Sequence, residues 1–210
     1  ALHRGYDVLI LTNAMRPMMR TRVRREIARL AETYGTKLTL RVSLDHYTAR
    51  LHDAERGTGA FETTLAGMRW LAAHRVRLQA AGRTMWGEAD ADGRTGFASL
   101  FASEGFDIDA YDPAALALFP EMDETADVPE ITTACWGILG KDPADVMCSN
   151  TRMVVKRRGA TRPSVLACTL LAYDAQFELG HTLAEAAQPV ALNHPHCARF
   201  CVLGGARCSA

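Results

Sequence analysis

Hydrophobic and polar residues alternate along residues 38–45, LTLRVSLD. One face of an extended chain would carry only apolar side chains, those of Leu38, Leu40, Val42 and Leu44. The opposite face would carry only polar ones, those of Thr39, Arg41, Ser43 and Asp45. Strict alternation predicts a β-strand between two different environments. We expect neighbouring helices to cover the apolar face, so that the polar face lines a cavity with Ser43 and Asp45 at its mouth. An edge strand with a solvated polar face is the alternative.

Strand and helix patterns alternate through the first half of the chain. Three further strands are predicted at Tyr6–Thr12, at Val76–Thr84 and, less regularly, at Ala115–Phe119. A helix is expected from Pro17 to about Tyr34, with an apolar stripe of Val23, Ile27 and Leu30 at helical spacing, and Gly35 would stop it. Another helix is expected at about Asp92–Glu104. Between them, a polar loop with Gly57 and Gly59 leads into a helix whose apolar stripe has helical spacing: Phe61, Leu65, Met68 and Leu71.

Repeated strand–helix units predict an α/β fold with a parallel sheet and right-handed crossovers. Ligands of such sheets bind at the carboxyl ends of the strands. The three main strand ends are all polar: Thr12 and Asn13, Ser43 and Asp45, Arg83 and Thr84. A polar interior favours a partial, open barrel over a closed one. Arginines on the polar faces (Arg41, Arg77 and Arg83) would suit a carboxylate or phosphate, or would pair with Asp45 or Glu88.

The second half of the chain has a different texture. An acidic, proline-bearing segment from about Met122 reads as a connection, so we place two domains at residues 1–121 and 122–210. Residues 151–156 and 164–169 flank a turn around Gly159 and predict a β-hairpin, which would bring Cys148 and Cys168 to the same end. A short helix is expected at Thr182–Ala187.

All six cysteines follow residue 130: Cys135, Cys148, Cys168, Cys197, Cys201 and Cys208. Such clustering indicates a metal site or disulfides rather than scattered core thiols. Since no secretion signal is visible, we expect a reducing, cytoplasmic setting, which favours iron–sulfur or zinc over disulfides. Cys135 stands apart from the others, which leaves a simple core residue as the alternative to a ligand, and His194 and His196 read as surface residues or as residues near a metal rather than its ligands.

Composition narrows the possible partners. The 210 residues carry 24 basic and 24 acidic side chains, and this zero net charge gives no general attraction to nucleic acid or anionic membranes. No apolar run approaches the roughly 20 residues of a membrane-spanning helix. The arginines between Arg16 and Arg25 read as a solvated helix face. Because the chain starts at Ala1 and enters an apolar run almost at once, we expect a fragment whose beginning is absent.

Several motifs resemble the radical S-adenosylmethionine (radical SAM) enzymes. Thr12-Asn13-Ala14 is similar to the TNG-like strand end of that family, Ser43-Leu44-Asp45 to its SLD-like strand end, and Arg56-Gly57 to the RG loop that follows. The similarity is good over residues 6–90. The layout of the second half, with Leu179-Gly180 and the cysteines from Cys197 onward, resembles the SPASM and twitch extensions of such enzymes, although the cysteine spacing differs from the common form.

The resemblance implies a partial α/β barrel, S-adenosylmethionine as cofactor, an electron donor, and radical chemistry on an unknown peptide or small molecule. Cofactor contacts would come from Asn13, Ser43, Asp45 and Arg83. An auxiliary 4Fe-4S cluster would be held by cysteines of the second half: Cys148, Cys168, Cys197, Cys201 and Cys208. The family's CxxxCxxC loop, which holds the radical-generating cluster, does not occur in this sequence. We therefore expect this chain alone not to cleave S-adenosylmethionine.

Two other functions remain open at this point. A non-catalytic scaffold that binds zinc or an iron–sulfur cluster would also explain the cysteines and the missing CxxxCxxC loop. A zinc hydrolase is a weaker alternative, because no HExxH-like helix pair occurs in the sequence.

Overall fold

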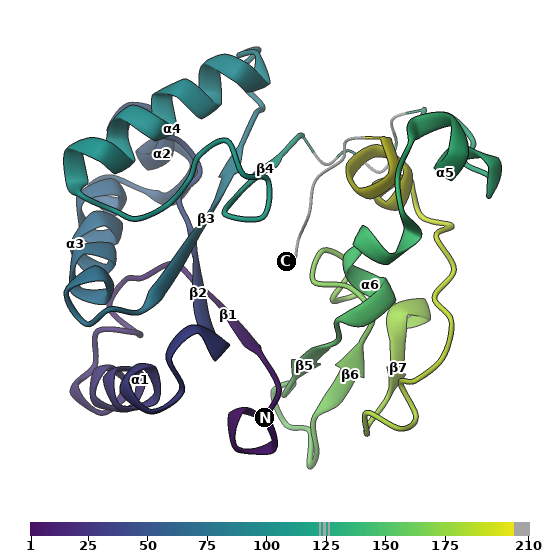
Figure 1. Cartoon of the computed structure of the whole chain (residues 1–210), viewed down its shortest axis with the longest axis horizontal. Helices are drawn as coiled ribbons and strands as arrows, with labels where there is room; N and C mark the ends of the chain where they lie inside the picture. Colours follow the sequence, from purple (N-terminus) through teal and green to yellow (C-terminus); the bar gives the residue numbers. More distant parts are fainter. Residues whose placement is uncertain (122, 124, 126, 204–210) are drawn as a thin grey trace. The chain divides into compact units, whose positions relative to one another are not determined.

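The computed structural model describes residues 1–121, 123, 125 and 127–203, and it divides into two compact units, Ala1–Glu121 and Met122–Ala210 (Figure 1). The strands of the first unit are β1 (Val8–Thr12), β2 (Leu38–Ser43), β3 (Arg77–Arg83) and β4 (Leu116–Phe119). Its helices are α1 (Thr21–Tyr34), α2 (Ala49–Arg56), α3 (Ala60–Ala73) and α4 (Asp90–Glu104), with short 3-10 turns at Leu2–Arg4 and Gly35–Lys37.

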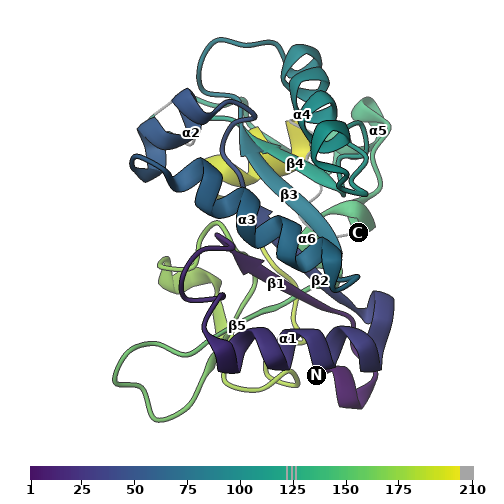
Figure 2. The same cartoon turned by 90° about the vertical axis from the view of Figure 1, so that its left-hand side faces the viewer.

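The four strands of the first unit form one parallel sheet in the order β1-β2-β3-β4. Helices α1, α3 and α4 lie along one face of this sheet (Figures 1 and 2). The predicted α/β fold with a parallel sheet is therefore confirmed. The edge-strand alternative for residues 38–45 is wrong, because β2 pairs with β1 on one side and with β3 on the other.

Burial on both faces explains the alternation of β2. Its apolar residues are fully buried in the core that the helices cover: Leu38, Leu40 and Val42. On the other face, Arg41 is 3% exposed, and its guanidinium donates to Gln79 Oε1 from Nε (3.1 Å) and Nη2 (2.6 Å) and to the Ala114 carbonyl (2.9 Å). The polar face is thus buried and filled by hydrogen-bonded side chains at its centre, and Arg41 is not free to receive a ligand.

Two helical predictions of the first unit need correction. The first helix begins at Thr21 and not at Pro17, because residues 16–19 form a turn that places Met18 in the core. Val23, predicted on the apolar stripe, is 39% exposed, and Ile27 and Ala31 are the buried positions. The stripe predicted for α3 is confirmed, since all four of its residues are buried: Phe61, Leu65, Met68 and Leu71.

Helix α2 was not predicted, since residues 46–59 read as a polar loop. It ends at Gly57, whose φ of 97° is a backbone conformation that glycine adopts without strain. The Asp53 carboxylate then accepts hydrogen bonds from the backbone N–H groups of Gly59 and Phe61, both at 2.8 Å. These bonds lower the pKa of Asp53. They also hold the short turn after which α3 begins.

The second unit consists of short elements. A three-stranded antiparallel sheet contains β5 (Met153–Val155), β6 (Ser164–Leu166) and β7 (Glu178–Gly180). Its helices are α5 (Ala134–Leu139), α6 (Met147–Asn150) and a π-helix at Cys197–Leu203, with 3-10 turns at Pro143–Asp145 and Ala175–Phe177. The hairpin around Gly159 is present but shorter than predicted, and β7 was not predicted. Residues 182–187, predicted as a helix, form only turns, with Pro189 close behind.

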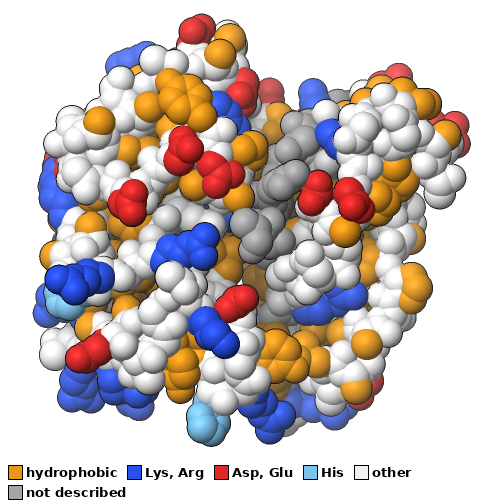
Figure 3. All heavy atoms as spheres, viewed as in Figure 1, with side chains coloured by type: hydrophobic (Ala, Val, Ile, Leu, Met, Phe, Trp, Pro, Cys, Tyr) orange, Lys and Arg blue, Asp and Glu red, His pale blue; other side chains and the backbone are white. Residues whose placement is uncertain are grey.

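Among the described residues, every helix is too short or too polar to cross a bilayer. Acidic and basic side chains are interspersed on the face that Figure 3 shows, in keeping with the zero net charge.

A close approach of two backbones fixes the carboxyl end of β1. Ala14 follows this strand with a φ of 55°, an uncommon conformation for a non-glycine residue, and it is fully buried. A Cβ added to Gly67 of α3 would lie 1.9 Å from the Ala14 carbonyl oxygen. The Thr64 hydroxyl donates to the Asn13 carbonyl at 3.2 Å. Helix α3 thus holds the end of β1 in place, and a side chain at Gly67 would prevent this close contact between the two backbones.

We predict that Gly67→Ala destabilises the first unit by about 1–3 kcal/mol, because the added methyl group must push α3 away from Ala14. Helix propensity alone would favour the change. The matched control is Ala66→Gly, one residue earlier on the exposed side of α3, with an expected loss of about 0.5–1 kcal/mol. Urea unfolding measures both. A Gly67→Ala variant as stable as the wild type would show that the two backbones are not held in contact.

Histidine 52 is a fully buried titratable side chain of α2. Its Nδ1 accepts a hydrogen bond from the Asp45 backbone N–H at 3.1 Å, and its Nε2 has no partner among the described residues. Burial lowers the pKa of His52 below its usual value of 6.5, although the Asp45 carboxylate acts in the opposite direction. The folded state therefore holds this imidazole neutral.

The lowered pKa makes stability depend on pH. Well above pH 6.5 neither the folded nor the unfolded state binds the proton, so stability is complete. As the pH falls from 6.5 toward the lower pKa of the folded state, the unfolded state binds the proton first and stability is lost, by up to about 1.4 kcal/mol per pH unit.

We predict a shallower loss between pH 7 and pH 5 for His52→Asn, whose side-chain oxygen can still accept from Asp45. Urea unfolding at each pH measures the difference from the wild type. The exposed His3 supplies the control variant, His3→Asn, which should follow the wild type. Equal slopes for wild type and His52→Asn would contradict the prediction.

Candidate functional site

The carboxyl ends of the parallel strands bring the predicted cofactor residues to one edge of the sheet. Thr12 is level with Val42, Ser43 with Ala81, and Arg83 with Phe119. These pairings place Asn13, Ser43, Asp45 and Arg83 at or just beyond the same edge, where parallel sheets bind their ligands. Their side chains differ in the hydrogen bonds and ion pairs that they make within the protein.

Asp45 is held by Arg56 at the end of α2. The guanidinium donates from Nε to Asp45 Oδ2 at 2.5 Å and from Nη2 to Oδ1 at 2.9 Å. The carboxylate is 6% exposed and the arginine side chain 31%. The Asp45 carbonyl also accepts from the Arg83 backbone N–H at 2.9 Å. This bidentate pair fixes both the strand end and α2, so Asp45 does not stand as a free carboxylate at the mouth of a cavity.

The other three residues are less constrained or differently bound. Arg83 donates to Glu55 at 2.9 Å, so the proposed pairing with Asp45 or Glu88 is wrong. The Asn13 amide oxygen accepts from the Met15 backbone N–H at 3.1 Å. The half-buried Ser43 makes no side-chain hydrogen bond within the described part of the chain, and its hydroxyl can therefore bind a ligand.

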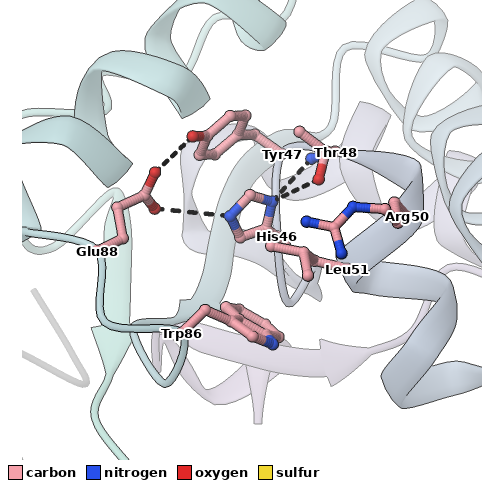
Figure 4. Close-up of a pocket in the computed structure, with 7 residues that line it drawn as sticks. All are labelled: His46, Tyr47, Thr48, Arg50, Leu51, Trp86 and Glu88. Carbon is pink, nitrogen blue, oxygen red and sulfur yellow. Dashed lines mark hydrogen bonds and ion pairs between the residues drawn. The ribbon is translucent and has the colours of Figure 1, made fainter.

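An open pocket of about 530 Å³ lies beside this edge (Figure 4). It is formed by the segment that follows β2 and by the segment that follows β3. Its lining residues are His46, Tyr47, Thr48, Arg50, Leu51, Trp86 and Glu88. None of these was chosen as a site residue from the sequence; Glu88 was considered only as a partner of arginine.

His46 has a defined protonation state in this pocket. Its Nδ1 accepts from the Thr48 backbone N–H at 3.0 Å, so the hydrogen of the neutral ring lies on Nε2, which is 3.5 Å from Glu88 Oε2. Burial lowers the pKa of His46, outweighing the Glu88 carboxylate, which favours the charged form. His46 therefore acts as a neutral donor to Glu88.

Tyr47 is the second donor to Glu88. Its hydroxyl donates to Glu88 Oε1 at 2.5 Å, and this bond raises the pKa of Tyr47. The ring lies against α4 where that helix carries Gly96, whose added Cβ would come within 2.4 Å of it. Both Glu88 oxygens are thus occupied by neutral donors.

In the second unit, four of the five proposed metal ligands line one apolar pocket. These are Cys148, Cys168, Cys197 and Cys201. Their neighbours in the wall are apolar side chains, among them Phe177, Val190 and Leu192. Cys208 lies outside the described residues. The core alternative for Cys135 is wrong: the residue is half-buried in α5, and its thiol accepts from the Thr132 backbone N–H at 3.4 Å.

The chemistry of this cysteine pocket is that of buried thiols. Burial raises the pKa of Cys148, with a further rise from Cys168 nearby, and it raises the pKa of Cys197 to about 11. A metal must therefore displace protons to bind here. Among the described residues, no three His, Cys, Asp or Glu side chains converge on a point that could hold a single metal ion. The space between the thiols is narrow, about 20 Å³.

His194 and His196 lie next to each other, with ring centroids 4.6 Å apart. The His194 ring contacts Phe177, a wall residue of the cysteine pocket, edge-on. His196 is buried, and its backbone N–H donates to His194 Nδ1 at 3.1 Å. His196 is therefore not a surface residue, and the prediction that neither histidine is a metal ligand stays untested.

Comparison with known proteins gives one kind of match. No family model and no curated protein matches the chain. Among solved structures, this chain is similar to native anSMEcpe with bound AdoMet, an anaerobic sulfatase-maturating enzyme of the radical SAM type. That match has a TM-score of 0.52 at 14% identity and covers 91% of this chain and 57% of the other.

A second structure of the same enzyme, with bound AdoMet and Kp18Cys peptide, gives a TM-score of 0.51 at 14% identity, covering 91% of this chain and 58% of the other. This chain thus spans somewhat more than half of the length of these enzymes. At such low identity the likeness is one of fold alone: the chain has a fold similar to that of radical SAM enzymes.

Proposed function

We propose that this chain is a portion of a radical SAM enzyme, which binds S-adenosylmethionine at the carboxyl edge of its parallel sheet and an auxiliary 4Fe-4S cluster in its cysteine pocket. The observation that carries the proposal is the edge itself: Asn13, Ser43, Asp45 and Arg83 gather there on a fold similar to that of an enzyme with bound AdoMet. The partial barrel and the SPASM-like character of the second unit belong to this proposal.

The residues at the edge take different roles. Ser43 offers a hydroxyl, and Asn13 offers the amide N–H groups that its turn does not use. Asp45 and Arg56 form a positioning pair, because the guanidinium occupies both carboxylate oxygens. Arg83 is half-buried, is bound to Glu55, and lies at this edge where β3 ends. Together these groups would orient the cofactor and exclude water.

Bound together, the cofactor and a radical-generating cluster would supply a 5′-deoxyadenosyl radical that removes a hydrogen atom from the substrate. An electron donor is required for this chemistry. The substrate would be a peptide or a small molecule; a peptide is present in one structure of the similar enzyme.

We assign a cluster rather than a single zinc ion to the cysteine pocket. Four thiols from three separate segments surround one apolar space, yet they do not converge on a single point in the described part of the chain. A zinc ion needs four ligands at about 2.0–2.3 Å from one centre, whereas a cluster is held by thiolates spread around a larger body. The cysteines would have to move apart, since the space between them is narrow.

Anaerobic reconstitution with iron and sulfide tests the cluster. We predict about four irons and four acid-labile sulfides per chain. Cys148→Ser and Cys168→Ser should each lose most of both, while Cys135→Ser, outside the pocket, should keep them. Zinc bound without sulfide would contradict the proposal and favour the metal-binding scaffold.

Equilibrium dialysis with labelled S-adenosylmethionine tests the sheet edge. We predict measurable binding that Ser43→Ala weakens about fivefold, the effect of one lost hydrogen bond, while Ser103→Ala on the exposed side of α4 leaves it unchanged. With dithionite added, no 5′-deoxyadenosine should form, because the sequence lacks the CxxxCxxC loop. Equal binding by both variants would refute the assigned edge, and release of 5′-deoxyadenosine would refute the need for that loop.

A further inference from the structure

The pocket of His46, Trp86 and Glu88 has no task in the function proposed above. It lies beyond the carboxyl ends of β2 and β3, next to Asp45 and the edge assigned to the cofactor. Its volume of about 530 Å³ falls within the range of small-molecule sites, roughly 300–1,000 Å³. Its charged and apolar lining residues indicate what it can bind.

One guanidinium of the pocket has no counter-ion among the residues that the structure describes. Neighbouring arginines are neutralised: Arg56 by Asp45, Arg83 by Glu55 and Arg94 by Asp90. Arg50 lines the pocket from the first turn of α2, is exposed, and has no hydrogen bond or ion pair with any residue that the structure describes. Asp53, three residues later on the same helix, is occupied by the backbone of the turn into α3.

The acidic residue of the pocket does not neutralise Arg50. Glu88 accepts a hydrogen bond from Tyr47 on Oε1, and its Oε2 lies 3.5 Å from His46 Nε2. The His46 ring stands between Glu88 and Arg50 (Figure 4). Because His46 is a neutral donor whose Nδ1 is bound to Thr48, it separates the two charges. The Arg50 side of the pocket therefore stays positive, and the Glu88 side stays negative.

The remaining wall is apolar. Trp86 is half-buried and meets the His46 ring edge-on, with centroids 5.0 Å apart and an interplanar angle of 89°. Leu51 lines the pocket next to Arg50. An arginine beside an indole and an aliphatic side chain suits an organic anion, whose charge can meet the guanidinium in a bidentate pair while its body covers the apolar wall.

We propose that this pocket binds the carboxylate of an organic substrate, with Arg50 holding the carboxylate and Trp86 and Leu51 contacting the apolar body. A singly charged carboxylate fits better than a phosphate, because Glu88 in the same pocket would repel a dianion more strongly. Naming the ligand a substrate rests on the proposed function; the binding of a carboxylate does not.

A pair of probes that differ only in charge tests the proposal on the full chain. Titration calorimetry compares 3-phenylpropanoate with its amide, 3-phenylpropanamide, at constant ionic strength. We expect the carboxylate to bind at least about tenfold more tightly, the effect of a charge-assisted pair. Arg50→Gln should abolish this preference and Arg50→Lys should keep part of it. Arg22→Gln, an exposed arginine of α1, is the matched control and should keep all of it.

A second substitution separates the apolar wall from the charge. Trp86→Leu should weaken both probes by a similar factor and leave their ratio unchanged. Equal binding of the two probes, no binding of either, or a carboxylate preference that survives Arg50→Gln would each overturn the proposal. Inorganic phosphate that competes as strongly as the carboxylate would also overturn it.

Competition with S-adenosylmethionine, which carries a carboxylate itself, decides between substrate and cofactor. We expect it not to displace 3-phenylpropanoate; Arg50-dependent displacement would assign the pocket to the cofactor and overturn the substrate assignment. The probe titrations use neither iron nor sulfide nor cofactor. Their failure therefore leaves the cluster and cofactor measurements of the proposed function untouched.

Discussion

The bidentate pair between Asp45 and Arg56 is the interaction on which the arrangement of the carboxyl edge depends. Asp45 follows β2, and its carboxylate, backbone N–H and carbonyl each bind a different partner: Arg56 at the end of α2, His52 within α2, and the backbone of Arg83 at the end of β3. A buried carboxylate without such a partner would be costly. One residue thus joins two strand ends to a helix, and the pocket residues that follow it, His46 to Leu51, take their places from this junction.

The sheet could be predicted from the sequence because its pattern is local. Alternation in residues 38–45 and the apolar run at residues 8–12 depend only on neighbouring residues, and so does the stripe of α3. Helix α2 lacks such a signal: its one fully buried residue is His52, a polar side chain. The turns at residues 182–187 show the opposite case, since this helical pattern is too short to stabilise a helix by itself.

The candidate site could be predicted only in part, because its decisive contacts join residues distant in sequence. The strand ends pointed to Ser43 and Asp45, but no pattern showed that Arg56 occupies Asp45. His46 and Glu88 are brought together by the register of β2 and β3 and lie in loops that have no periodicity. Polar and aromatic residues directly after two adjacent strands, His46-Tyr47 and Trp86 with Glu88, were the available signal. Adjacent parallel strands end together, so the segments after them meet.

The cysteines illustrate how the geometry of a pocket limits its chemistry. Sequence clustering favoured metal but left zinc and iron–sulfur open. Among the residues described, four thiols share an apolar wall without converging on a point, so the proposed cluster requires them to move apart. The same burial that raises the pKa of Cys148 and Cys197 keeps these thiols protonated near neutral pH. A bound metal must therefore displace those protons and widen the pocket, so that binding and rearrangement of the second unit are a single coupled step.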